Sequence, residues 1–456
     1  MSRSKRVAIV GFGTAGAQAG IQARKYDRNA QIDVFNAENR VLYSRCALPA
    51  LISGEIDDPG QLQPYPISFY QDTLRFNLHL GTRVAKVDPT TKTLTYVSGD
   101  DEWNLPYDEV VLATGGYAPR PTIPGAHLQG VHVFRTVEDA LLLRGLALQK
   151  SRVTVLGAGF VGMELADAFR KRGCDIQVIH RSPEVLSTIL DPDMGSVIRE
   201  AAQKSGVEFH LNSTIGTIRG RESVEEIEVG DAVLATDAIV SSIGVLPDLA
   251  LAQRLGLVIG ETGAIRVDEQ MRTNLEHIYS AGDGTEALHA VTNKPALFQL
   301  ATVSFRQGEV AGSSATGGAD IMYPMCGAST TRLFGMEIAS TGLVLRDATK
   351  LGMRAVGGRY RGTVKSEYYP EPGELTVKLL FDASDGRIIG AQAIGTDAAA
   401  RSIDLLTLCI HNRFTLNDLM KLETCYSPSV ASIINPVPVA SRLALRRIRT
   451  PVAQTG

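Results

Sequence analysis

The chain has 456 residues, of which 44% are hydrophobic and 21% charged, with a formal net charge of -3. This length exceeds what one hydrophobic core usually organises, so two or three domains are expected in a globular protein. The near-neutral charge argues against the basic surface that nucleic-acid-binding proteins present, so no nucleic-acid partner is predicted.

The first predicted element is a short apolar strand at residues 7–10. It is too short for a secretory signal or a membrane span, so we expect a cytoplasmic protein without a membrane partner. The strand continues into a loop with Gly11, Gly13 and Gly16 and then into a helix of small residues. Such a loop needs glycine for its tight turn, for close approach to a pyrophosphate and for helix packing. We therefore predict a dinucleotide site.

The second strand, at 32–35, ends at Asn36, where an acidic residue usually binds the adenine ribose. Asn36 is expected to make this contact through a hydrogen bond, and Glu38 is a second candidate. Cys46 follows, directly before a predicted helix at 47–52. The helix N-terminus and the neighbouring Arg45 are expected to stabilise its thiolate, the form that attacks a disulfide. We predict that Cys46 faces a flavin.

Two later segments are expected to complete the flavin site. The buried strand at 110–113 ends in a glycine turn with Thr114 and Gly115, and the strand at 276–282 delivers Asp283 to a ribityl hydroxyl. Between them the strand at 152–156 opens a second glycine loop. Two such loops indicate two dinucleotides, and the common reason for two is a flavin that a pyridine nucleotide reduces.

The second loop contains Gly157, Gly159 and Gly162, with Phe160 and Glu164 as further expected cofactor contacts. The strand after its helix ends at His180 and Arg181. No acid stands there, and Arg181 is suited to bind a 2'-phosphate, so NADPH is favoured over NADH.

From about residue 323 the sequence predicts a separate dimerisation domain. Strands at 375–381 and 388–391 flank a turn, a helix spans 398–412, and a surface helix spans 441–449. The predicted fold class is α/β, with two Rossmann-like domains for FAD and NAD(P)H and a C-terminal α+β domain. The expected limits are 1–117 with 246–322, 118–245 and 323–456.

The order of these motifs resembles the pyridine nucleotide-disulfide oxidoreductase family over nearly the whole chain. Most members of that family carry a CxxxxC pair, but Ala50 and Leu51 stand where the second cysteine would fall. The chain is therefore similar to the single-cysteine subgroup, which includes NADH oxidases, NADH peroxidases and coenzyme A-disulfide and persulfide reductases. The first glycine loop has Thr14 where the oxidases and peroxidases have histidine, which favours the coenzyme A-disulfide reductases.

This resemblance implies a homodimer with an active site shared between subunits. Tyr368 and Tyr426 would come from the neighbouring subunit and donate hydrogen bonds near the sulfur, while Gln22 and Lys25 would contact coenzyme A phosphates. The implied reaction is the reduction, by NADPH through FAD, of a mixed disulfide between Cys46 and a small thiol such as coenzyme A. Arg45 and the Ser-Pro-Ser after Tyr426 depart from the family pattern, and both are placed to line the substrate entrance.

Three alternatives remain open. Cys425, beside Tyr426, is a candidate second redox cysteine that would pair with Cys46 across the dimer. An NADH oxidase or peroxidase and a flavin electron-transfer or sensor protein have the same architecture. The other cysteines, Cys174, Cys326 and Cys409, are predicted to be structural, and no CxxC pair or Cys/His cluster indicates a metal site.

Overall fold

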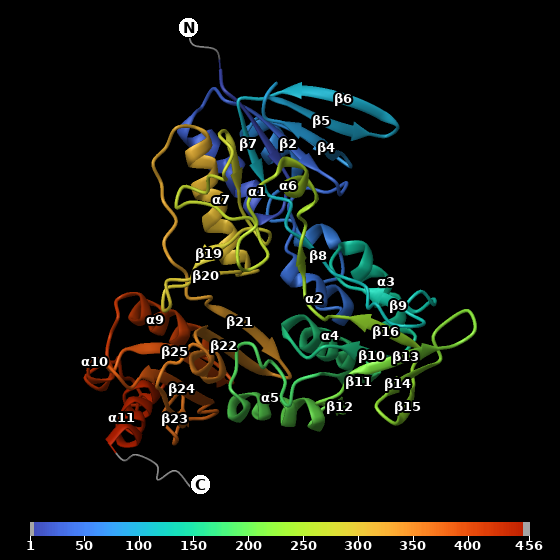
Figure 1. The fold of residues 1–456 in the computed structure, drawn as a ribbon. Helices are drawn as coiled ribbons and strands as arrows, with labels where there is room; N and C mark the ends of the chain where they lie inside the picture. Colours follow the sequence, from blue (N-terminus) through green and yellow to red (C-terminus); the bar gives the residue numbers. More distant parts are fainter. Residues whose placement is uncertain (1–3, 450–456) are drawn as a thin grey trace.

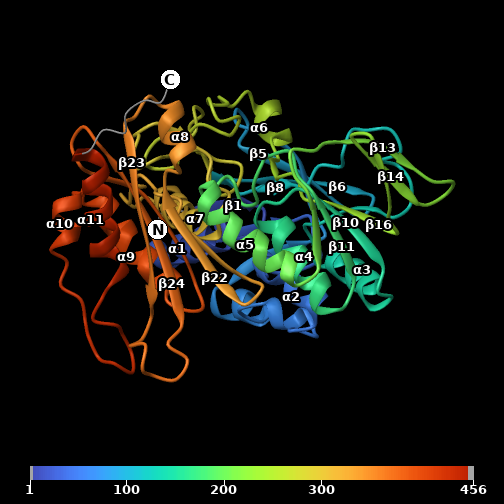
Figure 2. The same cartoon turned by 90° about the horizontal axis from the view of Figure 1, so that it is seen from below.

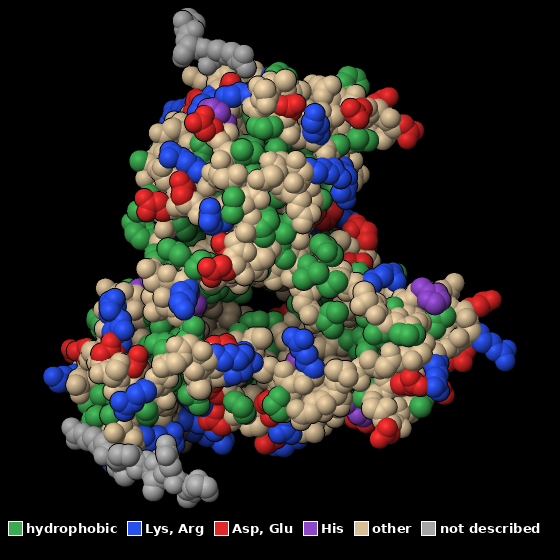
Figure 3. Space-filling model, in the orientation of Figure 1, with side chains coloured by type: hydrophobic (Ala, Val, Ile, Leu, Met, Phe, Trp, Pro, Cys, Tyr) green, Lys and Arg blue, Asp and Glu red, His purple; other side chains and the backbone are tan. Residues whose placement is uncertain are grey.

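The computed structural model describes residues 4–449 and shows three domains (Figure 1). The first lies at the top of the view, and the second and third lie below it, side by side. The space-filling view shows a deep hollow where the first domain meets the other two (Figure 3). Within the described residues, no helix has both the length and the apolar character that crossing a membrane requires.

The first domain is built on a parallel sheet of five strands in the order β18-β7-β1-β2-β3. All its strands except the edge strand β3 are buried almost continuously, as a parallel sheet covered on both faces requires. They are β1 (Arg6–Val10), β2 (Gln31–Asn36), β3 (Phe76–Leu80), β7 (Glu109–Leu112) and β18 (Ile278–Ser280).

Helices cover one face of this sheet and a second sheet covers the other. Helix α1 (Thr14–Tyr26) packs closely on α7 (Ala301–Ala315), because Gly308 and Gly312 let the backbones approach. Apolar side chains of an antiparallel sheet join the core on the opposite face. That sheet consists of β4 (Arg83–Asp88), β5 (Thr93–Ser98) and β6 (Asp101–Pro106).

The second domain repeats this plan with the strand order β12-β11-β10-β16-β9, again all parallel. Its strands are β9 (Val131–Val133), β10 (Arg152–Leu156), β11 (Asp175–Ile179), β12 (Val207–His210) and β16 (Ala238–Ser241). Its helices are α3 (Val137–Leu148), α4 (Phe160–Lys171) and α5 (Pro192–Lys204). An antiparallel sheet is added by β13 (Ile215–Arg219), β14 (Glu226–Val229) and β15 (Ala232–Ala235).

The first two domains are joined at two places. The chain passes between them through β8 (Gly116–Tyr117) and β17 (Leu246–Pro247), which pair with each other. Helix α2 (Leu48–Ser53), which follows Cys46, packs against α3 and α4. Leu51 is fully buried in the core of the second domain. The two limits expected between the first and second domains lie at the β8–β17 pair. All the expected domain limits, including the one at residue 323, stay a proposal.

The third domain is an antiparallel sheet in the order β21-β22-β25-β24-β23. Its strands are β21 (Ser329–Leu333), β22 (Met336–Gly342), β23 (Ala355–Thr363), β24 (Glu374–Asp382) and β25 (Ile388–Gly395). Figure 2 shows its main helices on the side of the sheet that faces away from the second domain. They are α9 (Ala399–His411), α10 (Leu416–Met420) and α11 (Pro436–Arg449).

The predicted hairpin at 375–391 and the helix at 398–412 are confirmed as β24, β25 and α9. The predicted surface helix at 441–449 is confirmed as part of α11, which exposes Arg442, Arg446 and Arg447, but its predicted start is wrong. Helix α11 begins five residues earlier, at Pro436, and Ala440 and Ala444 are fully buried against β23. Gly358 on β23 permits this contact, because a Cβ there would lie 1.9 Å from the Ala440 carbonyl oxygen.

The remaining elements are short. They are η1 (Arg45–Ala47), η2 (Pro59–Leu62), η3 (Phe69–Thr73), α6 (Ala250–Leu255), β19 (Ala287–Leu288), β20 (Pro295–Ala296) and α8 (Leu345–Lys350).

A buried ion pair fixes the third domain to the second. Lys378 on β24 and Asp191 at the start of α5 are 2.8 Å apart, with side chains only 9% and 2% exposed. Asp191 also accepts a hydrogen bond from the Leu345 backbone at 2.8 Å. Removing one partner would leave the other charge buried without compensation.

We therefore expect Lys378→Met to lower the free energy of unfolding by about 3 kcal/mol, measured by urea denaturation. Arg359→Gln is the matched control, because Arg359 lies 3.5 Å from Asp193 at a partly exposed position. It should cost less than about 1 kcal/mol. Equal effects of the two variants would contradict a special role for the buried pair.

Candidate active site

In the first glycine loop, two glycines lie against backbone atoms of the protein, and the third faces open space. Gly11 has φ +105°, and a Cβ there would lie 2.1 Å from the Ala113 oxygen. A Cβ on Gly16 would lie 1.9 Å from the Gly11 oxygen. Gly13, at the N-cap of α1, has no atom within 4 Å of its Cβ position. The loop thus presents free backbone to an incoming group, which fits a dinucleotide pyrophosphate at a helix N-terminus.

The second glycine loop has the same geometry. Gly157 has φ +105°, a Cβ on Gly162 would lie 1.9 Å from the Gly157 oxygen, and the Cβ position of Gly159 is open. His180, at the end of β11, accepts a hydrogen bond from the Ala158 backbone through Nδ1 at 3.3 Å. Burial and then the charge of Arg181 lower the pKa of His180, which favours the neutral ring that this bond requires.

The residues at the end of β2 contact one another. Asn36 donates from Nδ2 to the Arg40 carbonyl at 2.8 Å, so it braces the loop that follows, and its ribose contact stays a prediction. Glu38 accepts a hydrogen bond from the Tyr43 hydroxyl at 2.8 Å and forms an ion pair with Arg45. Arg45 also donates to the Arg135 carbonyl at 2.9 Å.

Cys46 lies in η1, immediately before α2, and its side chain is exposed. The sequence-based expectation of a stabilised thiolate is wrong, because the pKa of the Cys46 thiol is raised. Partial burial is the largest cause, followed by the carboxylates of Glu164 and Asp283, while Arg135 acts in the opposite direction. The Arg45 guanidinium is engaged with Glu38 and does not supply the expected positive charge.

Glu164, on α4, is the leading charged group that acts on Cys46. Its carboxylate accepts a hydrogen bond from the Thr331 hydroxyl of the third domain at 2.7 Å, and burial raises its own pKa. The sequence predicted Glu164 only as a cofactor contact. The structure adds an electrostatic effect of Glu164 on the Cys46 thiol.

Glu164→Gln should lower the pKa of Cys46, because it removes a negative charge that opposes the thiolate. The rate of Cys46 alkylation by iodoacetamide would then rise at lower pH than in the parent protein. The exposed Cys425 must be replaced by serine in both proteins, so that one thiol is measured. An unchanged or upward-shifted pH profile would contradict this electrostatic link.

Asp283 follows β18 and forms a short ion pair with Arg135, whose Nη2 lies 2.7 Å from Oδ2. Ser304 on α7 donates to the other carboxylate oxygen at 3.2 Å. Thr114 donates to the Asp248 carbonyl at 2.9 Å, and Gly115 has φ +70°. Sequence reasoning missed Arg135, which belongs to no glycine motif and lies in the connection between β9 and α3.

The two predicted tyrosines lie together on neighbouring loops of the third domain. The hydroxyls of Tyr368 and Tyr426 are 3.5 Å apart, and the two side chains are 75% and 50% exposed. Hydrogen bonding, first from Tyr426 and then from Ser366, lowers the pKa of Tyr368. Cys425 is also exposed. Whether these groups reach Cys46 of a partner stays a prediction.

The predicted substrate residues Gln22 and Lys25 lie on α1. Lys25 is exposed and lines a cavity of about 380 Å³ together with Arg24, Arg28 and Arg75. Gln22 does not line this cavity, and its side chain is hydrogen-bonded to Asp320 instead. The cavity lining is strongly basic, which suits a phosphate-bearing ligand.

The remaining predicted groups are also located. Phe160, at the start of α4, is half-buried and packs against the core of the second domain, so its contact with a nicotinamide stays a prediction. Cys174, Cys326 and Cys409 are buried, and their predicted structural role stays a prediction. Between residues 4 and 449, no three His, Cys, Asp or Glu side chains gather as a metal site would require.

Comparison with known proteins agrees with this arrangement. Residues 5–308 match the pyridine nucleotide-disulphide oxidoreductase domain, and residues 328–437 match the dimerisation domain of the same proteins. The chain is 31% identical to a protein named NADH oxidase from Methanocaldococcus jannaschii, with 97% of this chain and 99% of that one aligned.

Two further relatives act on sulfur according to their names. A NAD(P)H coenzyme A polysulfide/persulfide reductase from Pyrococcus horikoshii is 29% identical, with 96% of this chain and 98% of that one aligned. The structure of an NAD-dependent persulfide reductase from A. fulgidus superimposes with a TM-score of 0.93 at 28% identity, covering 97% of this chain and 83% of that one. The chain belongs to the pyridine nucleotide-disulphide oxidoreductase family, whose cofactors are FAD and NAD(P)H.

Proposed function

We propose that the protein uses NAD(P)H and FAD to reduce a small disulfide or persulfide, specifically one linked to coenzyme A, through the single redox cysteine Cys46. The observation that carries this proposal is the placement of Cys46. Its sulfur is exposed, whereas Leu51, at the position of a second redox cysteine, is fully buried and apolar. The second sulfur must therefore come from outside this segment.

The first glycine loop and Asp283 would hold FAD, and the second loop would hold NAD(P)H. Bound FAD supplies the two-electron relay between the pyridine nucleotide and sulfur. Cys46 thiolate attacks a disulfide RSSR, forming a Cys46–S–SR bond and releasing RS⁻. Two electrons then cleave that mixed disulfide to Cys46 thiolate and a second RS⁻. Two protons then convert the two RS⁻ groups to two RSH. In total, one RSSR, one NAD(P)H and one H⁺ give two RSH and one NAD(P)⁺.

The tyrosine pair is suited to deliver the proton to a departing thiolate. The hydroxyls of Tyr426 and Tyr368 share a hydrogen bond that lowers the pKa of Tyr368, which favours its use as a general acid. Figure 2 shows that loops of the third domain extend beyond its sheet. Both tyrosine side chains are exposed. They are accessible to the active site of a second subunit, so we propose a homodimer with a shared site.

Tyr426→Phe is expected to lower kcat for disulfide reduction about tenfold to a hundredfold, because it removes the bond that acidifies Tyr368. The pKa of Tyr368 should rise, measured as a shift of the alkaline limb of the kcat profile to higher pH. Tyr323→Phe is the matched control, since Tyr323 is 70% exposed on the same domain and has no such partner among the described residues. Equal effects of the two variants would exclude proton delivery by this pair.

The coenzyme A part of the proposal rests on the basic cavity beside α1. Lys25, Arg28 and Arg75 bring three cations to one opening, and coenzyme A carries a 3'-phosphate and a diphosphate. Two sulfur-reducing relatives also have coenzyme A or persulfide in their names. For the nucleotide we propose NADPH, because the exposed Arg181 follows β11 and no acid accompanies it there.

Intact mass spectrometry of the isolated protein tests the substrate. A coenzyme A adduct on Cys46 that a reductant removes, with faster NAD(P)H oxidation by coenzyme A disulfide or persulfide than by oxygen, would support the proposal. A different thiol adduct would replace coenzyme A as the substrate. No thiol adduct together with rapid oxygen consumption would favour a water- or peroxide-forming oxidase.

The oxidase is the second candidate, because the relative from M. jannaschii bears that name. Thr14, in place of histidine in the first glycine loop, argues against it. All five cysteines are unpaired, which agrees with a reducing compartment, and a cytoplasmic location remains our proposal.

A further inference from the structure

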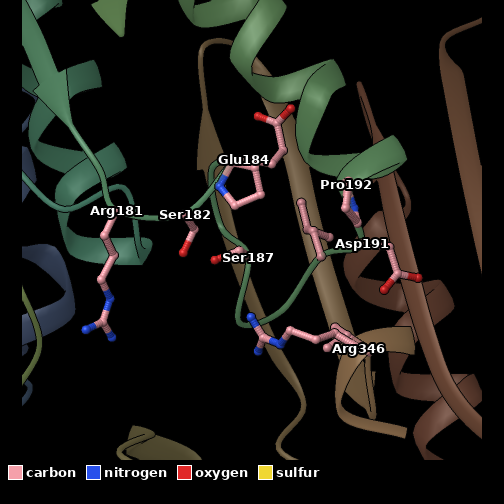
Figure 4. Close-up of a pocket in the computed structure, with 10 residues that line it drawn as sticks. Arg181, Ser182, Glu184, Ser187, Asp191, Pro192 and Arg346 are labelled. Atoms are coloured by element: carbon pink, nitrogen blue, oxygen red, sulfur yellow. The ribbon is translucent and has the colours of Figure 1, made fainter. Parts of the chain in front are cut away.

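A cavity of about 420 Å³ lies at the junction of the second and third domains. Arg181, Ser182 and Ser187 line it from the segment after β11, and Arg346 lines it from α8 of the third domain. Figure 4 shows the hydroxyls of the two serines facing the space between the two guanidinium groups. Two arginines and two hydroxyls around one opening form a donor set suited to a phosphate.

The acidic residues that line the cavity are already neutralised. Glu184 accepts hydrogen bonds from Arg199 at 3.0 and 3.1 Å, and Figure 4 shows its carboxylate directed away from the space between the arginines. Asp191 is paired with Lys378 at 2.8 Å. The uncompensated charge facing the cavity is therefore positive.

The two arginines differ in their partners. Arg181 is exposed and has no hydrogen-bond or ion-pair partner among residues 4–449. Arg346 donates from Nε and Nη2 to the Asp347 carboxylate at 2.9 and 3.1 Å, which leaves its Nη1 group without a partner in that same part of the chain. An exposed local pair of this kind stabilises little, so it does not prevent Arg346 from binding an anion.

The position of Arg346 is fixed by the domain junction. The backbone nitrogen of the preceding residue, Leu345, donates to Asp191 at 2.8 Å, and Asp191 lies at the end of the loop that carries Ser187. The buried Lys378–Asp191 pair holds the same loop from the sheet of the third domain. These contacts hold the loop that carries Ser187 and the segment that carries Arg346 in fixed positions on the two sides of the cavity.

We propose that this cavity binds the 2'-phosphate of NADPH, with Arg346 of the third domain as the second cation beside Arg181 and with Ser182 and Ser187 as hydroxyl donors. This inference rests on the proposed use of NADPH. The third domain then selects the nucleotide. A phosphomonoester is the shared chemistry of NADPH and coenzyme A, so the test compares 2'- and 3'-phosphates.

The experiment measures inhibition of the holoenzyme by 2',5'-ADP, 3',5'-ADP and 5'-AMP, competing with the pyridine nucleotide. Arg346→Gln should weaken 2',5'-ADP about tenfold and change 5'-AMP less than about twofold, as expected for one lost charge-assisted hydrogen bond. Arg346→Lys should retain part of the affinity, because it keeps the charge. Flavin content and melting temperature verify that each variant is folded.

Arg387→Gln is the matched control, because Arg387 forms a similar local pair with Asp385 on the β24–β25 turn. It should leave all three inhibitors unchanged. The parent protein should bind 2',5'-ADP more tightly than 5'-AMP. If only Arg181→Gln removes that preference, Arg346 does not bind the 2'-phosphate, but the proposed use of NADPH stands. If the parent protein shows no preference, both the cavity assignment and NADPH use are contradicted. A selective loss of 3',5'-ADP would contradict the assignment in favour of coenzyme A.

Discussion

Replacing Cys46 with serine is expected to lower kcat for disulfide or persulfide reduction on the order of 10³-fold or more, because no mixed disulfide can form. Cys46 is exposed and outside the hydrophobic cores, so the variant should retain its FAD and its stability within about 0.5 kcal/mol. The measurement is steady-state NAD(P)H oxidation with coenzyme A disulfide and with a persulfide, in enzyme of known flavin content.

Cys425→Ser separates this mechanism from a pair of cysteines across the dimer. Activity close to that of the parent protein is expected, because Cys425 lies on the third domain beside Tyr426 and has no role in the single-cysteine cycle. A loss as large as that of Cys46→Ser would establish an intersubunit pair. If Cys46→Ser kept full disulfide-dependent NAD(P)H oxidation, the reductase proposal would be wrong, and an electron-transfer or sensor protein would be favoured.

Gly16→Ala is expected to abolish FAD binding and to destabilise the first domain. The new Cβ would lie 1.9 Å from the Gly11 carbonyl oxygen, a backbone atom that cannot move without distorting the loop. Overpacking of this kind costs about 1–3 kcal/mol or more. The measurements are the flavin content of the purified protein and its melting temperature with FAD added.

Gly13→Ala is the matched variant that separates the fold from the cofactor. Its Cβ meets no protein atom within 4 Å, so the melting temperature without FAD should be nearly unchanged. FAD affinity should still fall about tenfold or more, because the methyl group occupies the space through which a pyrophosphate approaches α1. Equal destabilisation by both substitutions would show that the loop has no open face for a ligand.

The sequence alone was enough to predict the two glycine loops and to single out Cys46 as the candidate redox cysteine. Gly11 and Gly157 have positive φ, and Gly16 and Gly162 lie against backbone oxygens. Only glycine fits these positions, so the glycine spacing is visible in the sequence. The strands around them are continuous apolar runs, which local pattern also reveals. The hairpin of the dimerisation domain was predictable for the same reason.

Only the tertiary structure decided the surroundings of Cys46. Arg45 is adjacent in sequence, but its guanidinium turns to Glu38. The charges that act on the thiol come instead from Glu164, Asp283 and Arg135, which lie far apart in the sequence. Side-chain direction depends on the partners that the fold supplies, so neighbours in sequence gave the wrong sign for the pKa shift.

The same reason explains the junction between the second and third domains. Arg181 could be singled out from the end of its strand, but Arg346 carries no motif. It lies at the cavity in a junction where Asp191 contacts both Lys378 and the Leu345 backbone. The burial of α11 likewise depends on Gly358 of a distant strand. Backbone requirements such as a positive φ depend on short stretches of sequence, so they can be predicted from it. Contacts between distant segments depend on packing and on the pairing of buried charges, which only the folded structure shows.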